Sequence, residues 1–250
     1  MHRLARSVVT IALLGASAAT PVYRAAAQSA STPPVVARTM IAATKLLVVV
    51  GEPLHFKVVA VTLPAEQSSS FHGAAGFIYQ VSGSTEVSID GTTKTLSAAE
   101  GSFVAGILPA MLRAASGEPS TFLHFLLAPG AALDQPAETA PAVVKELYRT
   151  AAPIPDLKAG VYDLNLSRIT FPPQMPPNKP HYRSGGALYY VLSGTGSNTV
   201  GGNTEARPPG SLIYEPFGLV HQWGNPGDAP FTFLVFNINP DDTAAVLPAN

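Results

Sequence analysis

Short apolar segments recur along the chain, and turns that contain Gly, Pro, Asn or Asp separate them. Apolar segments of this length, bounded by turn residues, are typical of β-strands. The pattern predicts strands at residues 56–63, 77–81, 85–89, 122–127, 161–171, 188–192, 211–214 and 231–238. Residues 139–150 (TAPAVVKELYRT) instead show helical spacing between Pro136 and Pro153, which predicts a short helix. We therefore expect an all-β chain with one helical linker.

The two halves of the chain repeat one another. Residues 77–105 (FIYQVSGSTEVSIDGTTKTLSAAEGSFVA) align with residues 188–216 (LYYVLSGTGSNTVGGNTEARPPGSLIYEP) once two residues are skipped before the Gly-Ser pair. FLHF at 122–125 likewise matches FLVF at 233–236. The preserved order of strand, Gly turn, strand, Gly-Ser and strand favours a duplicated β unit over chance similarity. The repeat predicts two tandem β domains, at residues 40–130 and 159–245, joined by a linker at 131–158 that carries the helix.

The start of the chain has the pattern of an export signal. Basic residues at His2, Arg3 and Arg6 precede an apolar run at 7–19, and Ala25-Ala26-Ala27 offers a cleavage site of small residues. We expect a signal peptide at 1–27, of bacterial type, and a disordered lead-in at 28–39. The apolar run is shorter than the roughly 20 residues of a spanning helix. The mature protein is therefore expected to be periplasmic or secreted, without a stable membrane span.

Composition and charge exclude some partners and some kinds of chemistry. Charged residues are 12% of the chain, about half the share of roughly 25% in ordinary globular proteins, and the net charge is −1. Such a chain has no general field to attract phosphate backbones, so nucleic acid is not an expected partner. The absence of cysteine rules out disulfides and thiolate metal ligands.

Two motifs in the C-terminal half resemble those of the cupins, which are small jelly-roll barrels. The second cupin motif, G-x5-P-x-G-x2-H-x3-N, is matched at every fixed position. The matching residues are Gly210, Pro216, Gly218, His221 and Asn225. The first motif, G-x5-H-x-H-x3-4-E-x6-G, keeps only two of its fixed residues, at His181 and Gly194. Arg183, Ala187 and Met175 stand where it has the second histidine, the glutamate and the first glycine.

The N-terminal half keeps less of the two motifs. His72 and Gly83 remain from the first motif, with Ser70 and Gly76 at two of its other places, and Gly101 alone remains from the second. We expect His72 to be structural. The resemblance therefore covers roughly residues 40–240 and implies a bicupin, with two tandem jelly-roll barrels of which only the C-terminal one retains a site.

The resemblance also implies where that site lies. Strand side chains alternate, so His181 and Arg183 share a face, as do Ala187 and Tyr189 on the next strand, and in a cupin this face is the barrel interior. A complete cupin site holds one divalent ion (iron, manganese, nickel, copper or zinc) with three histidines and a carboxylate. Here only His181 and His221 carry over as metal ligands. The missing carboxylate and the added guanidinium weaken the attraction for a dication, so we expect a degenerate metal site.

Arg183 suits an anion, because its planar guanidinium binds carboxylates in bidentate fashion. Tyr189 and Trp223 would add aromatic walls to the cavity. Our first hypothesis is an exported bicupin whose C-terminal barrel binds a small anionic organic molecule at Arg183, His181 and His221.

Other hypotheses remain open at this point. One is a metal-dependent dioxygenase, isomerase or decarboxylase that uses His181 and His221 as ligands. A metal-free enzyme with a histidine proton shuttle is another, and a scaffold that acts through its surface or as a homo-oligomer is a third. The sequence does not decide whether the protein is an enzyme. Glu215, just before Pro216, is the nearest acidic residue and is a candidate proton-transfer partner or replacement ligand.

Overall fold

The structure, a computed structural model, describes residues 35–46 and 53–249. The predicted signal peptide and residues 28–34 of the predicted disordered lead-in lie outside the described residues, whereas residues 37–39 of that lead-in are ordered and begin a strand. The described residues form nineteen strands and one short 3-10 helix, η1 (Gly130–Ala132), and every strand predicted from the sequence overlaps an observed one. No helix in this part of the chain is long and apolar enough to cross a membrane.

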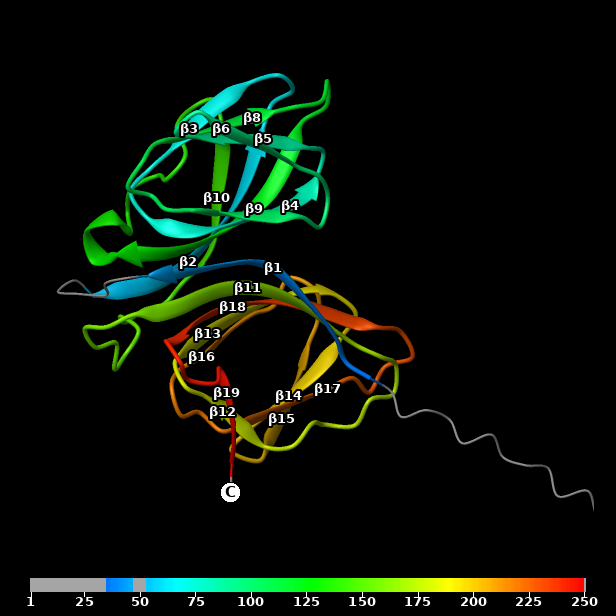
Figure 1. The fold of residues 1–250 in the computed structure, drawn as a ribbon. Coiled ribbons are helices and arrows are strands. Elements are labelled where there is room, and N and C mark those ends of the chain that lie inside the picture. Colours follow the sequence, from blue (N-terminus) through cyan, green and yellow to red (C-terminus); the bar gives the residue numbers. More distant parts are fainter. Residues whose placement is uncertain (1–34, 47–52, 250) are drawn as a thin grey trace, which may run out of the picture. The chain divides into compact units, whose positions relative to one another are not determined.

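The first barrel consists of two antiparallel sheets, ordered β10-β2-β9-β4-β7 and β3-β8-β5-β6 (Figure 1). Its strands are β2 (Leu54–Leu63), β3 (Ser68–Phe71), β4 (Ala75–Ser82), β5 (Thr85–Ile89), β6 (Thr92–Leu96), β7 (Gly101–Val104), β8 (Ala110–Ala114), β9 (Ser120–Pro129) and β10 (Val143–Arg149). Buried apolar side chains from both sheets, among them Val59, Ile78, Leu112 and Phe122, fill the space between them. This barrel therefore has a largely apolar interior.

The second barrel consists of two antiparallel sheets, ordered β1-β11-β18-β13-β16 and β15-β14-β17-β12-β19. Its strands are β1 (Ala37–Leu46), β11 (Tyr162–Phe171), β12 (His181–Arg183), β13 (Gly186–Ser193), β14 (Gly196–Val200), β15 (Asn203–Arg207), β16 (Leu212–Glu215), β17 (His221–Gly224), β18 (Phe231–Pro240) and β19 (Val246–Pro248). Its interior is lined by aromatic side chains, including Tyr189, Trp223 and Phe233.

The two barrels exchange strands. β1 comes first in the chain but pairs with β11 of the second barrel, from Ala37 opposite Thr170 to Leu46 opposite Tyr162. β10 lies between the two barrels in sequence and pairs with β2 of the first barrel. Residues 40–46, which the repeat assigned to the N-terminal domain, therefore extend a sheet of the C-terminal one.

The helix expected at residues 139–150 is wrong, because residues 143–149 form strand β10. A short isolated helix between prolines gains little stability of its own. The same residues, paired with β2 from Val143 opposite Thr62 to Arg149 opposite Lys57, satisfy the backbone groups of an otherwise open sheet edge. Valine and tyrosine also favour strands. Tertiary pairing thus overrides the local helical spacing.

One apolar cluster contains residues from both barrels. Phe236 of β18 packs edge-on against Phe56 of β2 and Phe77 of β4, with ring centroids 5.0 and 5.7 Å apart. Phe125 of β9 belongs to the same cluster, whereas its neighbour Leu126 faces the interior of the first barrel. Because this sheet is buried on both faces, its strands read as continuous apolar runs rather than as alternating ones.

Candidate functional site

The structure brings together the residues that the motifs singled out. His181 and Arg183 lie on β12, Tyr189 on β13, and His221 and Trp223 on β17. His181 pairs directly with His221 across the ladder, and the two imidazole centroids are 4.2 Å apart. All five side chains therefore converge on one end of the second barrel.

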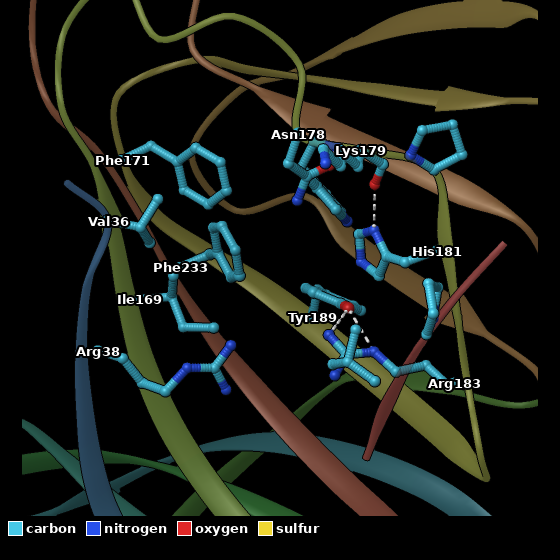
Figure 2. Close-up of a pocket in the computed structure, with 14 residues that line it drawn as sticks. Val36, Arg38, Ile169, Phe171, Asn178, Lys179, His181, Arg183, Tyr189 and Phe233 are labelled. Carbon is cyan, nitrogen blue, oxygen red and sulfur yellow. Dashed lines mark hydrogen bonds between the residues drawn. The ribbon is translucent and has the colours of Figure 1, made fainter. Parts of the chain in front are cut away.

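A cavity of about 460 Å³ opens between these strands and β1. Four of the five predicted residues line it, and His221 lies behind His181 with only 1% of its surface exposed. An apolar wall is formed by Ile169, Phe171, Tyr189 and Phe233 (Figure 2), and Trp223 also lines the cavity. The indole of Trp223 stacks on Tyr189 and on Phe233, with centroids 5.0 and 5.2 Å away. The cavity therefore presents a rigid aromatic surface to a ligand.

Arg183 is a charged side chain that is almost completely buried. It is 4% exposed, and Nε donates a hydrogen bond to the hydroxyl oxygen of Tyr189 at 3.0 Å. Nη2 donates to the same oxygen. Nη1 is buried without a hydrogen-bond partner among the described residues. Buried donors are normally paired, so this nitrogen is an unsatisfied donor on a residue that lines the cavity.

Glu215 supplies a carboxylate that the motif comparison did not expect inside the site. It is fully buried, and Oε1 accepts a hydrogen bond from Nε1 of Trp223 at 2.9 Å. Oε2 lies 2.9 Å from Nε2 of His221 and 3.7 Å from Nε of Arg183. The sequence argument that the site lost its carboxylate is therefore wrong. Glu215 stands directly opposite Ala187 on the neighbouring strand, so a carboxylate is present across from the motif position at which the cupins have glutamate.

These contacts keep Glu215 ionised. Burial alone would raise the pKa of this carboxyl group, but the contact with His221 and the charges of His221 and Arg183 hold its pKa below the ordinary value. Its negative charge compensates the guanidinium of Arg183, which would otherwise be a costly buried cation.

Backbone contacts fix the orientation of both histidines. Nδ1 of His181 lies 2.9 Å from the carbonyl oxygen of Lys179, and Nδ1 of His221 lies 2.8 Å from that of Leu219. A carbonyl only accepts, so Nδ1 carries the proton in each ring and Nε2 is left for another partner. Burial lowers the pKa of His181 and favours its neutral form.

The described residues do not fit a metal ion held by a full set of protein ligands. They contain no group of three or more His, Cys, Asp or Glu side chains placed to hold one. Nε2 of His221 and Oε2 of Glu215 are adjacent, but the guanidinium of Arg183 lies beside that oxygen. Two unit charges about 4 Å apart repel by roughly 4 kcal/mol at an effective dielectric constant of about 20, and a dication doubles this. Metal ligation by His181 and His221 stays a prediction.

Arg38 and Lys179 also line the cavity, and the sequence analysis named neither. Figure 2 shows Arg38 and Arg183 extending toward one another from opposite sides. Burial, and after it the charge of Arg183, lowers the pKa of Arg38. Arg38 lies on β1, outside both motifs, and reaches the cavity only through the strand exchange. No local sequence signal marks such a residue.

Comparison with known proteins identifies the fold. Residues 167–237 match the Cupin_2 family, described as a cupin domain. No curated protein sequence matches the chain. Among solved structures, oxalate decarboxylase from Bacillus subtilis, a protein with Mn(II) centres, superposes with a TM-score of 0.57 at 15% identity, over 84% of this chain and 78% of that one. A salicylate 1,2-dioxygenase variant from Pseudoaminobacter salicylatoxidans gives 0.51 at 12%, over 74% and 70%.

Sequence identities this low show only that the folds are similar. The chemistry of this chain has to be inferred from the residues of its own site. The matched segment runs from β11 to β18 and so contains both motif histidines. The matched segment shows that residues 167–237 belong to a cupin domain, and the superpositions together with the two jelly-roll barrels show that the chain has a bicupin-like fold.

Proposed function

We propose that the second barrel binds a small organic carboxylate in the cavity between Arg38, Arg183 and the aromatic wall. The observation that carries this proposal is the free Nη1 of Arg183, which is buried, charged and without a partner among the described residues. A carboxylate oxygen is the acceptor that a guanidinium binds best. The aromatic wall would hold the apolar part of the same molecule.

Charge supports an anion rather than a neutral ligand. Glu215 compensates one guanidinium, but Arg38 and Lys179 leave an excess of positive charge around the cavity. The volume of about 460 Å³ falls within the range of roughly 300–1,000 Å³ typical of small-molecule sites. Oxalate and salicylate, named with the two similar structures, are both small organic acids. With the predicted export signal, we propose that binding takes place in the periplasm or outside the cell.

A binding experiment tests this proposal directly. Benzoate, salicylate and oxalate are titrated into the mature protein by calorimetry, with benzamide as the neutral counterpart of benzoate. Arg183→Gln should weaken binding of the best acid by about 10- to 100-fold, because it removes a buried charge-assisted hydrogen bond. Arg38→Gln should weaken it by about 2- to 5-fold, since Arg38 is partly exposed.

Arg113→Gln provides the matched control, because Arg113 lies on β8 of the first barrel and pairs with Glu86 at the surface. It should leave binding unchanged. Equal affinity for benzamide and benzoate, or full affinity in both cavity variants, would contradict the proposal.

Metal-dependent catalysis is the second candidate, and the pairing of a buried imidazole and a buried carboxylate, His221 Nε2 and Glu215 Oε2 at 2.9 Å, is the observation in its favour. One equivalent of a divalent ion that survives chelation and is lost in His181→Ala would establish it. A protein that stays metal-poor and still binds an acid would support the first candidate.

A further inference from the structure

Glu215 is the centre of the polar cluster at the base of the cavity. Its oxygens face the indole of Trp223, the imidazole of His221 and the guanidinium of Arg183. His181 packs edge-on against His221 and presents its ring to the cavity (Figure 2). The cluster thus contains one carboxylate and two imidazoles, together with a single permanent cation.

The guanidinium of Arg183 lies beside side chains of the types that bind metal ions in other proteins. Nδ1 of each histidine is bound to a backbone carbonyl, an arrangement that also orients imidazoles toward a metal ion. The guanidinium of Arg183 stands where such an ion would compensate Glu215, since its Nε is 3.7 Å from Oε2. The hydroxyl oxygen of Tyr189 fixes the guanidinium in this position, because it accepts hydrogen bonds from both Nε and Nη2 of Arg183.

We infer that Arg183 is the resident cation of this site in place of a metal ion, and that anion binding in the cavity needs no metal. A covalently attached guanidinium cannot dissociate, and it keeps Nη1 free for the ligand. The second half of this inference rests on the proposed function. The first half concerns only the protein and is tested without any organic ligand.

Space in the cluster supports the same assignment. Ala187 is fully buried opposite Glu215, and its methyl group occupies little of the space between β13 and β16. The carboxylate of Glu215 contacts His221 of β17 and Arg183 of β12 in the opposite sheet. Glu215 therefore contacts both His221 and Arg183, and His181 packs against His221, so the side chain at position 183 decides whether this group contains a cation or another donor.

The decisive variant is Arg183→His. It removes the cation and adds a third imidazole beside His181, His221 and Glu215, which gives the nitrogen and oxygen donors that Zn²⁺ and Co²⁺ prefer. After chelation and dialysis against Zn²⁺ or Co²⁺, this variant should retain about one equivalent of metal by elemental analysis. The wild-type protein should retain less than about a tenth as much. Bound Co²⁺ should also show the visible absorption of a low-coordinate site.

Three control variants separate the loss of the cation from the gain of a metal ligand. Arg183→Gln removes the charge without adding a strong ligand and should stay metal-poor, and so should Arg183→Lys, which keeps a cation. Glu215→Gln in the Arg183→His background should lose most of the metal, because it removes the anionic donor. Circular dichroism of each variant establishes that it is folded.

Three results would overturn the inference. They are a full equivalent of metal in the chelated and reloaded wild-type protein, a folded Arg183→His variant that binds none, and loss of carboxylate binding on chelation. If Arg183→His does not fold, the wild-type metal titration alone still decides. If the wild-type protein and the variants retain metal as expected but no carboxylate binds, the assignment of Arg183 as the resident cation is supported and the proposed function is contradicted.

Discussion

Replacing Glu215 with alanine should lower the free energy of unfolding by about 3–5 kcal/mol, because it leaves a buried cation without its counter-charge. Arg183 is 4% exposed and Glu215 is fully buried, so water cannot take over the missing contact. Nε1 of Trp223 loses its acceptor as well. Urea denaturation followed by fluorescence measures the change, and Trp223 is the single tryptophan of the chain, so the signal comes from the site itself.

In the same experiment, Glu215→Gln separates the effect of losing the charge from the effect of losing the side chain, because glutamine has nearly the same shape as glutamate. The amide oxygen can still accept from Trp223, so this variant should lose less stability than Glu215→Ala. The double variant Arg183→Met/Glu215→Leu should recover much of the loss, since it removes both charges. A loss below about 1 kcal/mol in Glu215→Ala would mean that Arg183 does not depend on this carboxylate.

The pH dependence of stability follows from the same group. Contacts with His221 and Arg183 hold the pKa of Glu215 below its ordinary value despite burial. A carboxyl group whose pKa is lower in the folded state stabilises the protein above its unfolded pKa, and this contribution is lost as the pH falls through the folded pKa. The stability difference between the wild-type protein and Glu215→Gln should therefore narrow on acidification below the ordinary carboxyl range.

Most of the fold could be predicted from the sequence because its strands carry strong local signals. Apolar runs between Gly and Pro turns predicted β2, β4, β9, β13 and β18. The repeat predicted a second domain of the same kind. The failure at residues 143–149 has a clear cause, because no local pattern shows that the edge of β2 is open and that this segment will pair with it.

The candidate site could be predicted where it depends on motif spacing and strand alternation. The histidines, Arg183, Tyr189 and Trp223 do converge, as alternation on neighbouring strands requires. Glu215 could be named but not placed, since a shift of one residue in a short strand reverses the direction of its side chain. Arg38 could not be found, because its place in the cavity depends on β1 crossing to the other barrel.

The first barrel contains a buried pair with a different expected role. Nδ1 of His124 lies 2.5 Å from Oε1 of Glu138, and neither side chain is exposed. Phe71 packs against the imidazole with a centroid distance of 4.3 Å. Thr139, next to Glu138, is bound to β3, where its backbone nitrogen donates to the carbonyl oxygen of Ser70 at 2.9 Å. His72, the motif residue expected to be structural in this barrel, is exposed, and its structural role stays a prediction.

Glu138→Leu alone should destabilise the protein by about 3–5 kcal/mol, because one buried polar partner remains without the other. His124→Leu alone should have a similar effect. The double variant should be close to wild-type stability or above it, since two apolar side chains suit an interior already formed by residues such as Phe71 and Phe122. Urea denaturation of the four proteins gives the coupling energy of the pair as a double-mutant cycle.

Ligand binding then distinguishes the two barrels. Carboxylate affinity should be unchanged in the His124→Leu/Glu138→Leu protein, because this pair lies in the first barrel and the cavity with Arg38 and Arg183 lies in the second. The Arg183→Met/Glu215→Leu protein should instead be stable but unable to bind the acid. If the first-barrel double variant lost binding while it remained folded, the site would extend beyond the second barrel. Retained binding in the first-barrel double variant would show that the His124–Glu138 pair stabilises its barrel, whereas the His221–Glu215 pair belongs to the binding site.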